Sequence, residues 1–433
     1  MKQNPSSLLL ACVVACGASG AIAADWPQFR GPTGDGIAQA KGLPLTWSPT
    51  ENIAWKTAIP GRGRSSPVIL GDRIFLTTAV ETNIRRFSEG PDAMQQAERA
   101  VIGAVCLDRA TGKLIYHVDL LPLEKPGAIN WLNTYATPTP VVEPGRLYCD
   151  FGAFGTVCVD SATGRILWQR SLPVDHHHGP GSSAIVHKNL LILVRDGRDQ
   201  QYLAALDKQT GVTVWKTSRP PLRTPIAEFR KSFSTPLIFE AAGRTQMVVA
   251  GAQWLVSYDP ETGKELWRAD DGNGETAAPR PVFGNGLVYL TTGVLGSARP
   301  QLWAIRVDGQ GDVTKTHVAW KLSTQVPMVS SPLLVGQDLY IVSDDGIIAC
   351  VDALTGQVLN KHRAGGSHYA SPTFAEGRLY FFNRDGKATI LEAGKELKPL
   401  AENQLDGPLF ASPAFVDSAI YIRTDTHLYC VRK

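Results

Sequence analysis

The densest cluster of side chains that could do chemistry is Asp175-His176-His177-His178, which a Gly-Pro-Gly turn follows. Imidazole and carboxylate groups together are typical ligands of zinc, copper or iron. Three consecutive histidines on one turn cannot all point at one ion, so a metal site would need His368 or Asp196 as well. The same stretch also suits a ligand contact through His178 or an ordinary polar turn. We therefore predict no metal site, and a site that did form would use His176, His178 and His368.

Two pairs of basic residues are the next candidates. Arg62 and Arg64 flank a glycine, and Arg230 precedes Lys231. Such pairs can bind a carboxylate or phosphate, and the alternative is solvated loop charge. Asp344-Asp345-Gly346 resembles a fragment of a calcium loop but is more typical of a turn between strands. Gly-x-Ser-x-Gly, phosphate-loop and His-Glu-x-x-His motifs do not occur, so no catalytic residue is assigned.

A recurring turn organises the elements that must position these residues. In Asp259-x-x-Thr262-Gly263-x-x-x-Trp267 the Asp and Thr oxygens accept backbone hydrogen bonds, Gly takes the positive-φ position, and Trp restarts an apolar strand. The eight-residue step from Asp to the aromatic position recurs, with changes at the last residue, at Asp108–Tyr116, Asp160–Trp168, Asp207–Trp215 and Asp352–Asn360. Trp55 and Trp320 occupy the same position in less regular repeats. We expect these aromatic residues to serve packing in outer strands.

A second marker, a small residue followed by proline, opens an apolar strand in phase with the first. It recurs mostly every 40 to 52 residues, from Ser66-Pro67 to Ser412-Pro413. Eight such repeats of four strands are typical of a β-propeller, so the sequence predicts an all-β, eight-bladed propeller over residues 53–433. The strand at Trp55 lacks preceding strands, and residues 412–433 supply only three. We expect the N-terminal strand to complete the last blade and close the ring.

Strand direction assigns the candidate residues to one face. Loops that join successive blades share a face with loops between the second and third strands of each blade. We call this the long-loop face, because it carries the insertions 80–100, 120–137 and 217–232, the first of which we expect to be partly helical. Asp196 comes from a loop between the second and third strands of a blade. Residues just before the innermost strands should line the mouth of the central channel. These residues are Arg62, Arg64, Asn133, Tyr135, His178, Arg230, Lys231, His368 and Tyr369.

The N-terminal region predicts export. An apolar run from Leu8 to Ala18 and the Ala21-Ile22-Ala23 site are typical of a signal peptide over residues 1–23, and the run is too short to span a bilayer. The alternative is a lipoprotein anchored through Cys16. Either route places the chain in the periplasm or outside the cell. Residues 24–52 form an N-terminal extension that we expect on the outside or on one face of the propeller.

Charge and cysteine content restrict the partners. A net charge of +3 without a block of Lys or Arg argues against nucleic acid. Five of the seven cysteines lie beyond the signal region, are odd in number and do not cluster. Equivalent positions on neighbouring blades lie too far apart for a disulfide, so we expect these cysteines to serve as small buried side chains.

The tandem Asp-x-x-Thr-Gly-x-x-x-Trp turns resemble those of the quinoprotein-like propellers, or pyrroloquinoline-quinone (PQQ) repeats, over nearly the whole mature chain. Trp26-Pro-Gln-Phe-Arg-Gly-Pro is similar to the opening of secreted bacterial members. The family includes PQQ-dependent alcohol and glucose dehydrogenases and the propeller lipoprotein of the outer-membrane barrel-assembly machinery. The resemblance therefore implies the fold, whereas the function must come from a site.

The dehydrogenase members carry a vicinal Cys-Cys disulfide, calcium ligands and a catalytic Asp, none of which maps onto this sequence. We predict no cofactor. The leading hypothesis is a monomeric binding or scaffold module that engages an envelope or extracellular protein, or a small ligand at the channel mouth, through its long-loop face. The alternative is a PQQ- or metal-dependent oxidoreductase with its site at that mouth.

Overall fold

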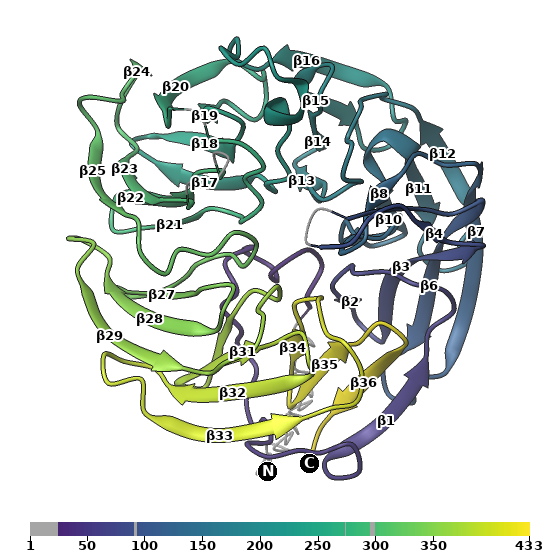
Figure 1. Ribbon diagram of the computed structural model, residues 1–433. Coiled ribbons are helices and arrows are strands. Elements are labelled where there is room, and N and C mark those ends of the chain that lie inside the picture. Colours follow the sequence, from purple (N-terminus) through teal and green to yellow (C-terminus); the bar gives the residue numbers. More distant parts are fainter. Residues whose placement is uncertain (1–24, 91–92, 273, 295–298) are drawn as a thin grey trace, which may run out of the picture.

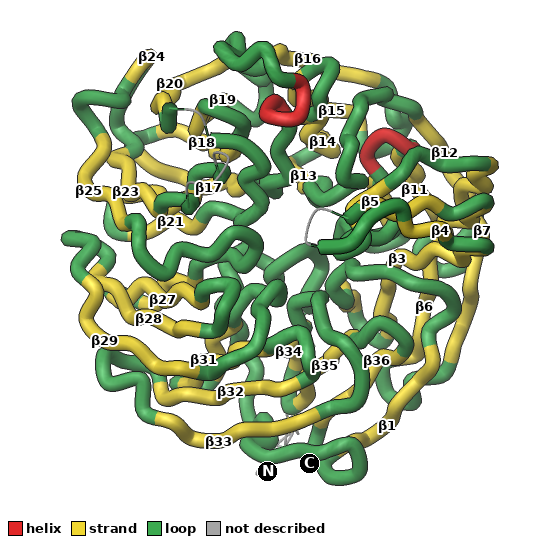
Figure 2. The backbone as a smooth tube through the Cα atoms, in the orientation of Figure 1, coloured by secondary structure: helices red, strands yellow, loops and turns green. Residues whose placement is uncertain are grey.

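Sheets arranged around a common centre make up the structure (Figure 1), a computed structural model. It describes residues 25–433 except 91–92, 273 and 295–298, so the predicted signal peptide and the alternative anchor Cys16 lie outside the described residues. Within those limits, the only helices are two 3-10 turns, η1 (Gly152–Phe154) and η2 (Ala227–Arg230) (Figure 2). No helix in this part of the chain is long and apolar enough to cross a bilayer.

Within the described ranges, eight main sheets follow one another along the chain, and each runs from an inner to an outer strand. Sheets 1 to 4 are β2 (Val68–Leu70), β3 (Arg73–Thr82), β6 (Arg99–Asp108) and β7 (Leu114–Glu124); β9 (Val141–Glu143), β10 (Arg146–Asp150), β11 (Thr156–Asp160) and β12 (Ile166–Arg170); β13 (Ile185–His187), β14 (Leu190–Asp196), β15 (Gln201–Asp207) and β16 (Thr213–Ser218); and β17 (Leu237–Ala241), β18 (Arg244–Ala250), β19 (Trp254–Tyr258) and β20 (Glu265–Asp270), with β24 (Gly311–Asp312) added outside β20.

Sheets 5 to 8 repeat the same antiparallel order. They are β21 (Val282–Gly284), β22 (Leu287–Thr291), β23 (Leu302–Arg306) and β25 (Val318–Leu322); β26 (Leu333–Val335), β27 (Asp338–Val342), β28 (Ile347–Asp352) and β29 (Val358–Arg363); β30 (Thr373–Ala375), β31 (Arg378–Phe382), β32 (Lys387–Glu392) and β33 (Pro399–Gln404); and β34 (Ala414–Val416), β35 (Ala419–Arg423), β36 (His427–Val431) and β1 (Ile53–Ala58). The outer strand of sheet 8 is thus β1, which pairs antiparallel with β36.

The insertion at residues 80–100 forms strands, so the prediction of partial helix was wrong. β3 and β6 stay paired as far as Thr82 and Arg99, beyond the length of the other hairpins. β4 (Arg85–Arg86), β5 (Met94–Gln96) and β8 (Ile129–Asn130) then form a small separate sheet. The β-branched residues that continue β3 and β6 explain the extension, because such side chains fit a pleated sheet better than a helix.

Five of the repeated turns, at Gly112, Gly164, Gly211, Gly263 and Gly356, contact the aromatic residue of the preceding sheet. In the turn before β16, the carboxylate of Asp207 accepts from the amide of Thr210 at 2.8 Å. Gly211, with φ +72°, lies on the Trp168 ring of sheet 2, and a Cβ there would come within 2.7 Å of the indole. The Trp168 indole also donates to the Lys208 carbonyl at 3.1 Å. The aromatic position of the repeat therefore packs on the turn of the following sheet.

The residues that precede the inner strands, which are small in every main sheet except sheet 5, form a series of hydrogen bonds around the centre. The buried amide of each donates to the hydroxyl of its equivalent in the next sheet at 2.8 to 3.0 Å: Ser66 to Thr139, Thr139 to Ser183, Ser183 to Thr235, Arg280 to Ser331, Ser331 to Ser371, and Ser371 to Ser412. Each bond satisfies a buried donor between two sheets. Arg280 carries no hydroxyl and so offers none to sheet 4.

The N-terminal extension runs along the inner strands, and not only over the outside or one face as expected. Trp26 bridges to Ile69 of β2, and Ile37 bridges to Phe374 of β30. Between them, the segment bonds to residues before the inner strands of sheets 5 and 6. The Arg280 guanidinium donates to the Phe29 carbonyl at 2.7 Å, and the Arg30 guanidinium donates to the Pro332 carbonyl at 2.8 Å. Residues 26–37 thus lie against the inner ends of sheets 1, 5, 6 and 7.

Candidate functional site

Strand pairing brings the two loop classes of the long-loop face together. β8 lies in the loop between sheets 1 and 2, and it pairs with β5 from the loop between β3 and β6. Farther along the chain, the Arg198 amide donates to the Asp175 carbonyl at 2.8 Å. The Met328 amide likewise reaches the Asp344 carboxylate at 3.2 Å. Loops of both classes therefore build one surface. Most candidate residues fall into two separate groups there, and two others are core residues.

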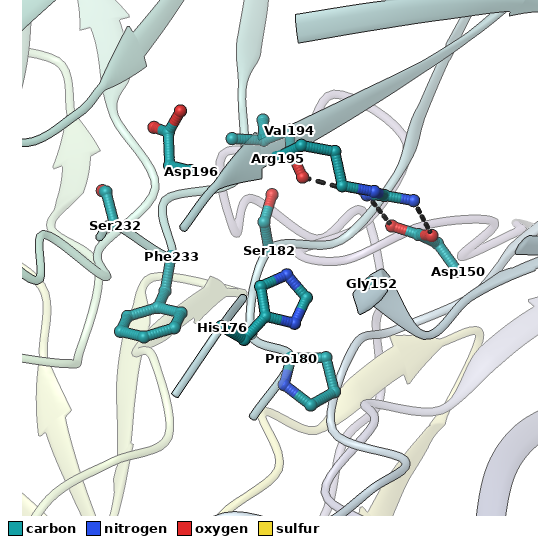
Figure 3. A pocket seen from close by; sticks show the side chains of 11 residues that line it. Asp150, Gly152, His176, Pro180, Ser182, Val194, Arg195, Asp196, Ser232 and Phe233 are labelled. Carbon is teal, nitrogen blue, oxygen red and sulfur yellow. Dashed lines mark hydrogen bonds and ion pairs between the residues drawn. The ribbon is translucent and has the colours of Figure 1, made fainter. Parts of the chain in front are cut away.

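His176 lies in the wall between sheets 2 and 3 (Figure 3). Its Nδ1 accepts from the Ala153 amide at 3.3 Å. Gly152 permits this approach, because a Cβ at that residue would lie 1.9 Å from the imidazole Cε1. Burial, followed by the nearby Arg195 charge, lowers the pKa of His176 to about 4. This histidine is therefore a neutral, packed side chain at physiological pH.

A buried ion pair lies beside His176 (Figure 3). Arg195 donates to both carboxylate oxygens of Asp150, at 2.7 and 3.0 Å, and to the Thr156 hydroxyl at 3.1 Å. The adjoining cavity is about 10 Å³, which is room for about one water molecule. Because both carboxylate oxygens bind the guanidinium, this cluster ties two sheets together. We missed Asp150 and Arg195 in the sequence, although an arginine inside the apolar run of β14 is a signal for a buried partner.

His178 lies on the same loop and stacks against Phe233, with ring centroids 6.5 Å apart. Burial, followed by the Lys231 charge, lowers the pKa of His178 to about 3. The side chain of Asn133 donates to the His178 carbonyl at 2.9 Å and to the Pro180 carbonyl at 3.0 Å. Asn133 therefore holds the histidine loop in place through its backbone.

The neighbouring charged candidates bond within the protein. Asp196 is buried against Arg219, whose Nη2 lies 3.1 Å from the Asp196 carboxylate. Desolvation raises the pKa of Asp196 in spite of this cation. The buried Lys231 ammonium lies 3.5 Å from the Glu275 carboxylate, and burial lowers the pKa of Lys231. Arg230 donates to two carbonyls of its own loop at 3.2 Å.

The second group lies where sheets 7, 8 and 1 meet. Arg62 pairs with Glu81 at 3.0 Å, and the Arg64 guanidinium carbon lies 3.5 Å from the centre of the Phe410 ring. Tyr369 contacts the same ring, with centroids 5.2 Å apart. Desolvation lowers the pKa of Arg64 to about 10. This part of the mouth is an aromatic and cationic cluster.

Two candidates are core residues. His368 is buried, its Nδ1 donates to the Gly366 carbonyl at 3.3 Å, and burial lowers its pKa to about 4. Tyr135 is buried in the insertion, where its hydroxyl donates to Gly127 at 3.1 Å and accepts from the Ala97 amide at 3.2 Å. Throughout the described ranges, no three His, Cys, Asp or Glu side chains are grouped so that they could hold a metal.

Large apolar side chains are exposed on three loops of this face. Ile84 and Phe87 flank β4, Ile226 precedes η2, and Met328 and Val329 precede β26. The β4 arginines lie over aromatic rings, with the Arg86 guanidinium 4.3 Å from the centre of the Trp131 ring and the Arg85 guanidinium 5.4 Å from that of Phe87. These exposed apolar side chains lie in loops, so the alternation of inward and outward residues along a strand does not explain why they are exposed.

Comparison with known proteins decides the family. The family model described as outer membrane protein assembly factor BamB matches three overlapping stretches, residues 84–253, 201–368 and 251–424. The chain belongs to this PQQ-repeat β-propeller family. It is 26% identical over 180 residues to BamB of Marinobacter adhaerens, a match that covers 41% of this chain and 42% of that protein. It is 27% identical over 187 residues to quinohemoprotein alcohol dehydrogenase ADH-IIG of Pseudomonas putida, covering 37% and 24%. Each match spans less than half of the relative.

Solved structures confirm the predicted all-β propeller. BamB from Moraxella catarrhalis has a TM-score of 0.55 at 13% identity, covering 82% of this chain and 100% of that chain. Quinohemoprotein alcohol dehydrogenase from Comamonas testosteroni has a TM-score of 0.54 at 14% identity, covering 96% and 82%. The all-β, PQQ-type propeller is therefore correct.

The residues at the channel do not assemble the site that the dehydrogenase resemblance implies. PQQ carries three carboxylates, and the resemblance also requires calcium ligands. Here the guanidiniums near the histidine loop are bound to carboxylates: Arg195 to Asp150 and Arg219 to Asp196. Arg64 faces an aromatic ring. These residues therefore do not fit PQQ.

Proposed function

We propose that this protein is an exported binding module whose long-loop face docks a protein partner of the cell envelope. In this proposal the eight main sheets are the eight blades of a propeller, and the pairing of β1 with β36 closes the ring. The match to the BamB family supports an envelope partner. The bonds between neighbouring sheets support a rigid platform, since buried amides such as that of Ser66 and the Trp168 indole are satisfied across sheet boundaries.

The observation that carries the proposal is the exposed surface of the β4–β5–β8 insertion. Phe87 is 50% exposed and Ile84 is 42% exposed, and Arg85 and Arg86 lie beside them. Aromatic and arginine side chains are enriched at the centres of protein interfaces. β4 is also an edge strand of the small sheet, so it can accept a strand from a partner. A partner with an acidic, apolar segment fits this surface.

Site-specific crosslinking in intact cells tests the docking surface. A photoreactive residue at position 84 should capture one envelope protein, and Phe87→Ala should abolish that product without loss of folded protein. Val212→Ser is the matched control, because Val212 is exposed but lies in a Thr-Gly turn on the opposite face. The proposal is refuted if no adduct forms, or if both substitutions weaken the adduct equally.

The oxidoreductase alternative rests on the 27% identity to the alcohol dehydrogenase. Purified protein should be incubated with PQQ, calcium and a panel of alcohols and sugars, with dye reduction as the readout. Saturable turnover that His178→Ala abolishes would favour the enzyme. Intact-mass analysis of the exported protein separates the two processing routes, because cleavage near Ala24 and lipidation of Cys16 give different masses.

A further inference from the structure

A cavity of about 330 Å³ lies at the centre of the ring, away from the long-loop candidates. One side is the N-terminal segment, and the other is formed by the inner strands β13, β17 and β21. Its volume falls within the range of about 300–1,000 Å³ that is typical of small-molecule sites. The N-terminal segment and the inner strands, two parts of the chain far apart in sequence, thus border a partly open space of ligand size.

The strand side of this cavity is apolar. Ile185, Ile238, Phe239 and Phe283 are among its lining residues. Phe239 and Phe283 stack with ring centroids 4.1 Å apart and planes inclined by 10°. Three of these side chains, those of Ile238 and the two phenylalanines, are only half-buried although they lie on inner strands. They form a flat apolar wall suited to a hydrocarbon or aromatic group.

Arg280 supplies a buried cation at the edge of this wall. The residue is 3% exposed and lines the cavity. It replaces the hydroxyl residue that the other main sheets carry, and its Nη1 donates to the Phe29 carbonyl at 2.7 Å. Within the described ranges, no carboxylate lies within 4.0 Å of its guanidinium, and its Nε has no hydrogen-bond partner. A buried cation without a bonded counter-ion is costly unless something compensates it.

The charges around Arg280 leave one positive charge without a balancing carboxylate. Arg30 is a second buried guanidinium close to Arg280, and it too lacks an ion pair within the described residues. Asp35 is the acidic residue whose charge acts on both cations. Its Oδ1 already accepts from the Thr33 hydroxyl at 2.7 Å and the Ile37 amide at 2.9 Å. Two cations and one carboxylate match a ligand that carries a single negative charge.

We propose that this cavity binds a small amphiphilic monocarboxylate, with its apolar part against the Phe239–Phe283 wall and its carboxylate toward Arg280. The apolar wall selects a hydrocarbon or aromatic tail. The single unbalanced cation selects a monoanion over neutral or polyanionic molecules. Because the N-terminal segment forms the opposite side, a bound ligand also bridges this segment to sheets 3 to 5.

Isothermal titration calorimetry on the full mature chain tests the site with octanoate, 3-phenylpropionate and the uncharged octanamide. We expect one carboxylate per chain and at least tenfold weaker binding of the amide. Arg280→Ser should abolish this tenfold preference. Serine restores the hydroxyl that the other sheets carry here, so this variant is designed to fold.

Two further variants show whether a change in binding comes from the site or from a folding defect. Arg280→Lys keeps the cation and should retain most of the preference for carboxylate. Val186→Phe narrows the cavity and should weaken all three probes by a similar factor. The proposal is overturned if wild-type protein binds neither carboxylate at millimolar concentration, if the amide binds as well as octanoate, or if Arg280→Ser leaves the preference intact.

Discussion

His176 should make the stability of this protein sensitive to acid between pH 6.5 and pH 4. The imidazole is packed against Gly152, its Nδ1 accepts from the Ala153 amide, and Arg195 lies nearby. Protonation would place a second cation beside the guanidinium and would put a proton on the accepting nitrogen. Burial is the largest effect that disfavours the imidazolium and the Arg195 charge is the next, so the pKa falls from 6.5 in the unfolded chain to about 4 in the folded protein.

Proton linkage gives the sign and the size of the change in the free energy of unfolding with pH. Below pH 6.5 the unfolded chain binds a proton at this histidine while the folded protein does not, so the free energy of unfolding falls as the pH falls. The loss levels off below the folded pKa of about 4. Each pKa unit corresponds to about 1.4 kcal/mol, so this residue accounts for a loss of about 3 kcal/mol between pH 7 and pH 4.

Urea unfolding followed by tryptophan fluorescence at pH 7, 6, 5 and 4 measures the effect. His176→Asn keeps an acceptor near the Nδ1 position but cannot be protonated, so its loss of stability over this range should be about 3 kcal/mol smaller than that of wild type. Val212→Ser, at an exposed turn residue without an ionisable group, is the control and should follow wild type. Parallel pH profiles for wild type and His176→Asn would refute the assignment of a neutral buried imidazole.

Two further predictions concern the contacts between sheets, with urea midpoints as the measurement. Gly243→Ala should lower the free energy of unfolding by about 1 kcal/mol, because φ is +71° but nothing lies within 4 Å of the new Cβ. Gly211→Ala should lower it by about 3 kcal/mol, because the new Cβ there also meets Trp168. Equal losses would mean that the indole contact is unimportant. Asp150→Asn should cost about 3–5 kcal/mol by leaving Arg195 buried without a carboxylate, and Asp150→Leu combined with Arg195→Met should cost less. A double variant no more stable than Asp150→Asn would contradict the charge-burial argument.

The repeated features of the fold were predictable because each repeat encodes its own contacts. The Asp-x-x-Thr-Gly turn specifies local hydrogen bonds, and the aromatic residue eight positions after Asp reaches the next turn, so short-range spacing reports on packing between sheets. The small residue before proline serves a similar role through its hydroxyl. The insertion at 80–100 was mispredicted as helical because its Gln and Ala content suggested helix, whereas continued pairing with β6 decided its structure.

The candidate site was harder to predict because loop position does not determine side-chain direction. Membership of the long-loop face follows from strand direction, and β5–β8 pairing agrees with it. Whether a residue there points into solvent or into the wall depends on partners far along the chain. His368 and Tyr135 are buried by such contacts, and Asp196 turns toward Arg219. Arg219 lies outside any repeat motif, so local spacing could not identify this partner.

A residue that departs from the repeat, such as Arg280, therefore indicates a binding site better than the residues that follow the repeat. Stability alone would favour serine or threonine at position 280, because a hydroxyl there could accept the amide of the preceding sheet, as Ser331 does for Arg280. Arginine gives up that acceptor and buries a cation. It gains a bond to the Phe29 carbonyl, yet one neutral hydrogen bond does not offset the burial of a charge without a bonded counter-ion. The unpaired charge beside an apolar cavity is better explained by a ligand than by the fold. Arg280→Ser separates the two explanations, since a residue with a purely structural role would change the urea midpoint and leave carboxylate selectivity unaffected.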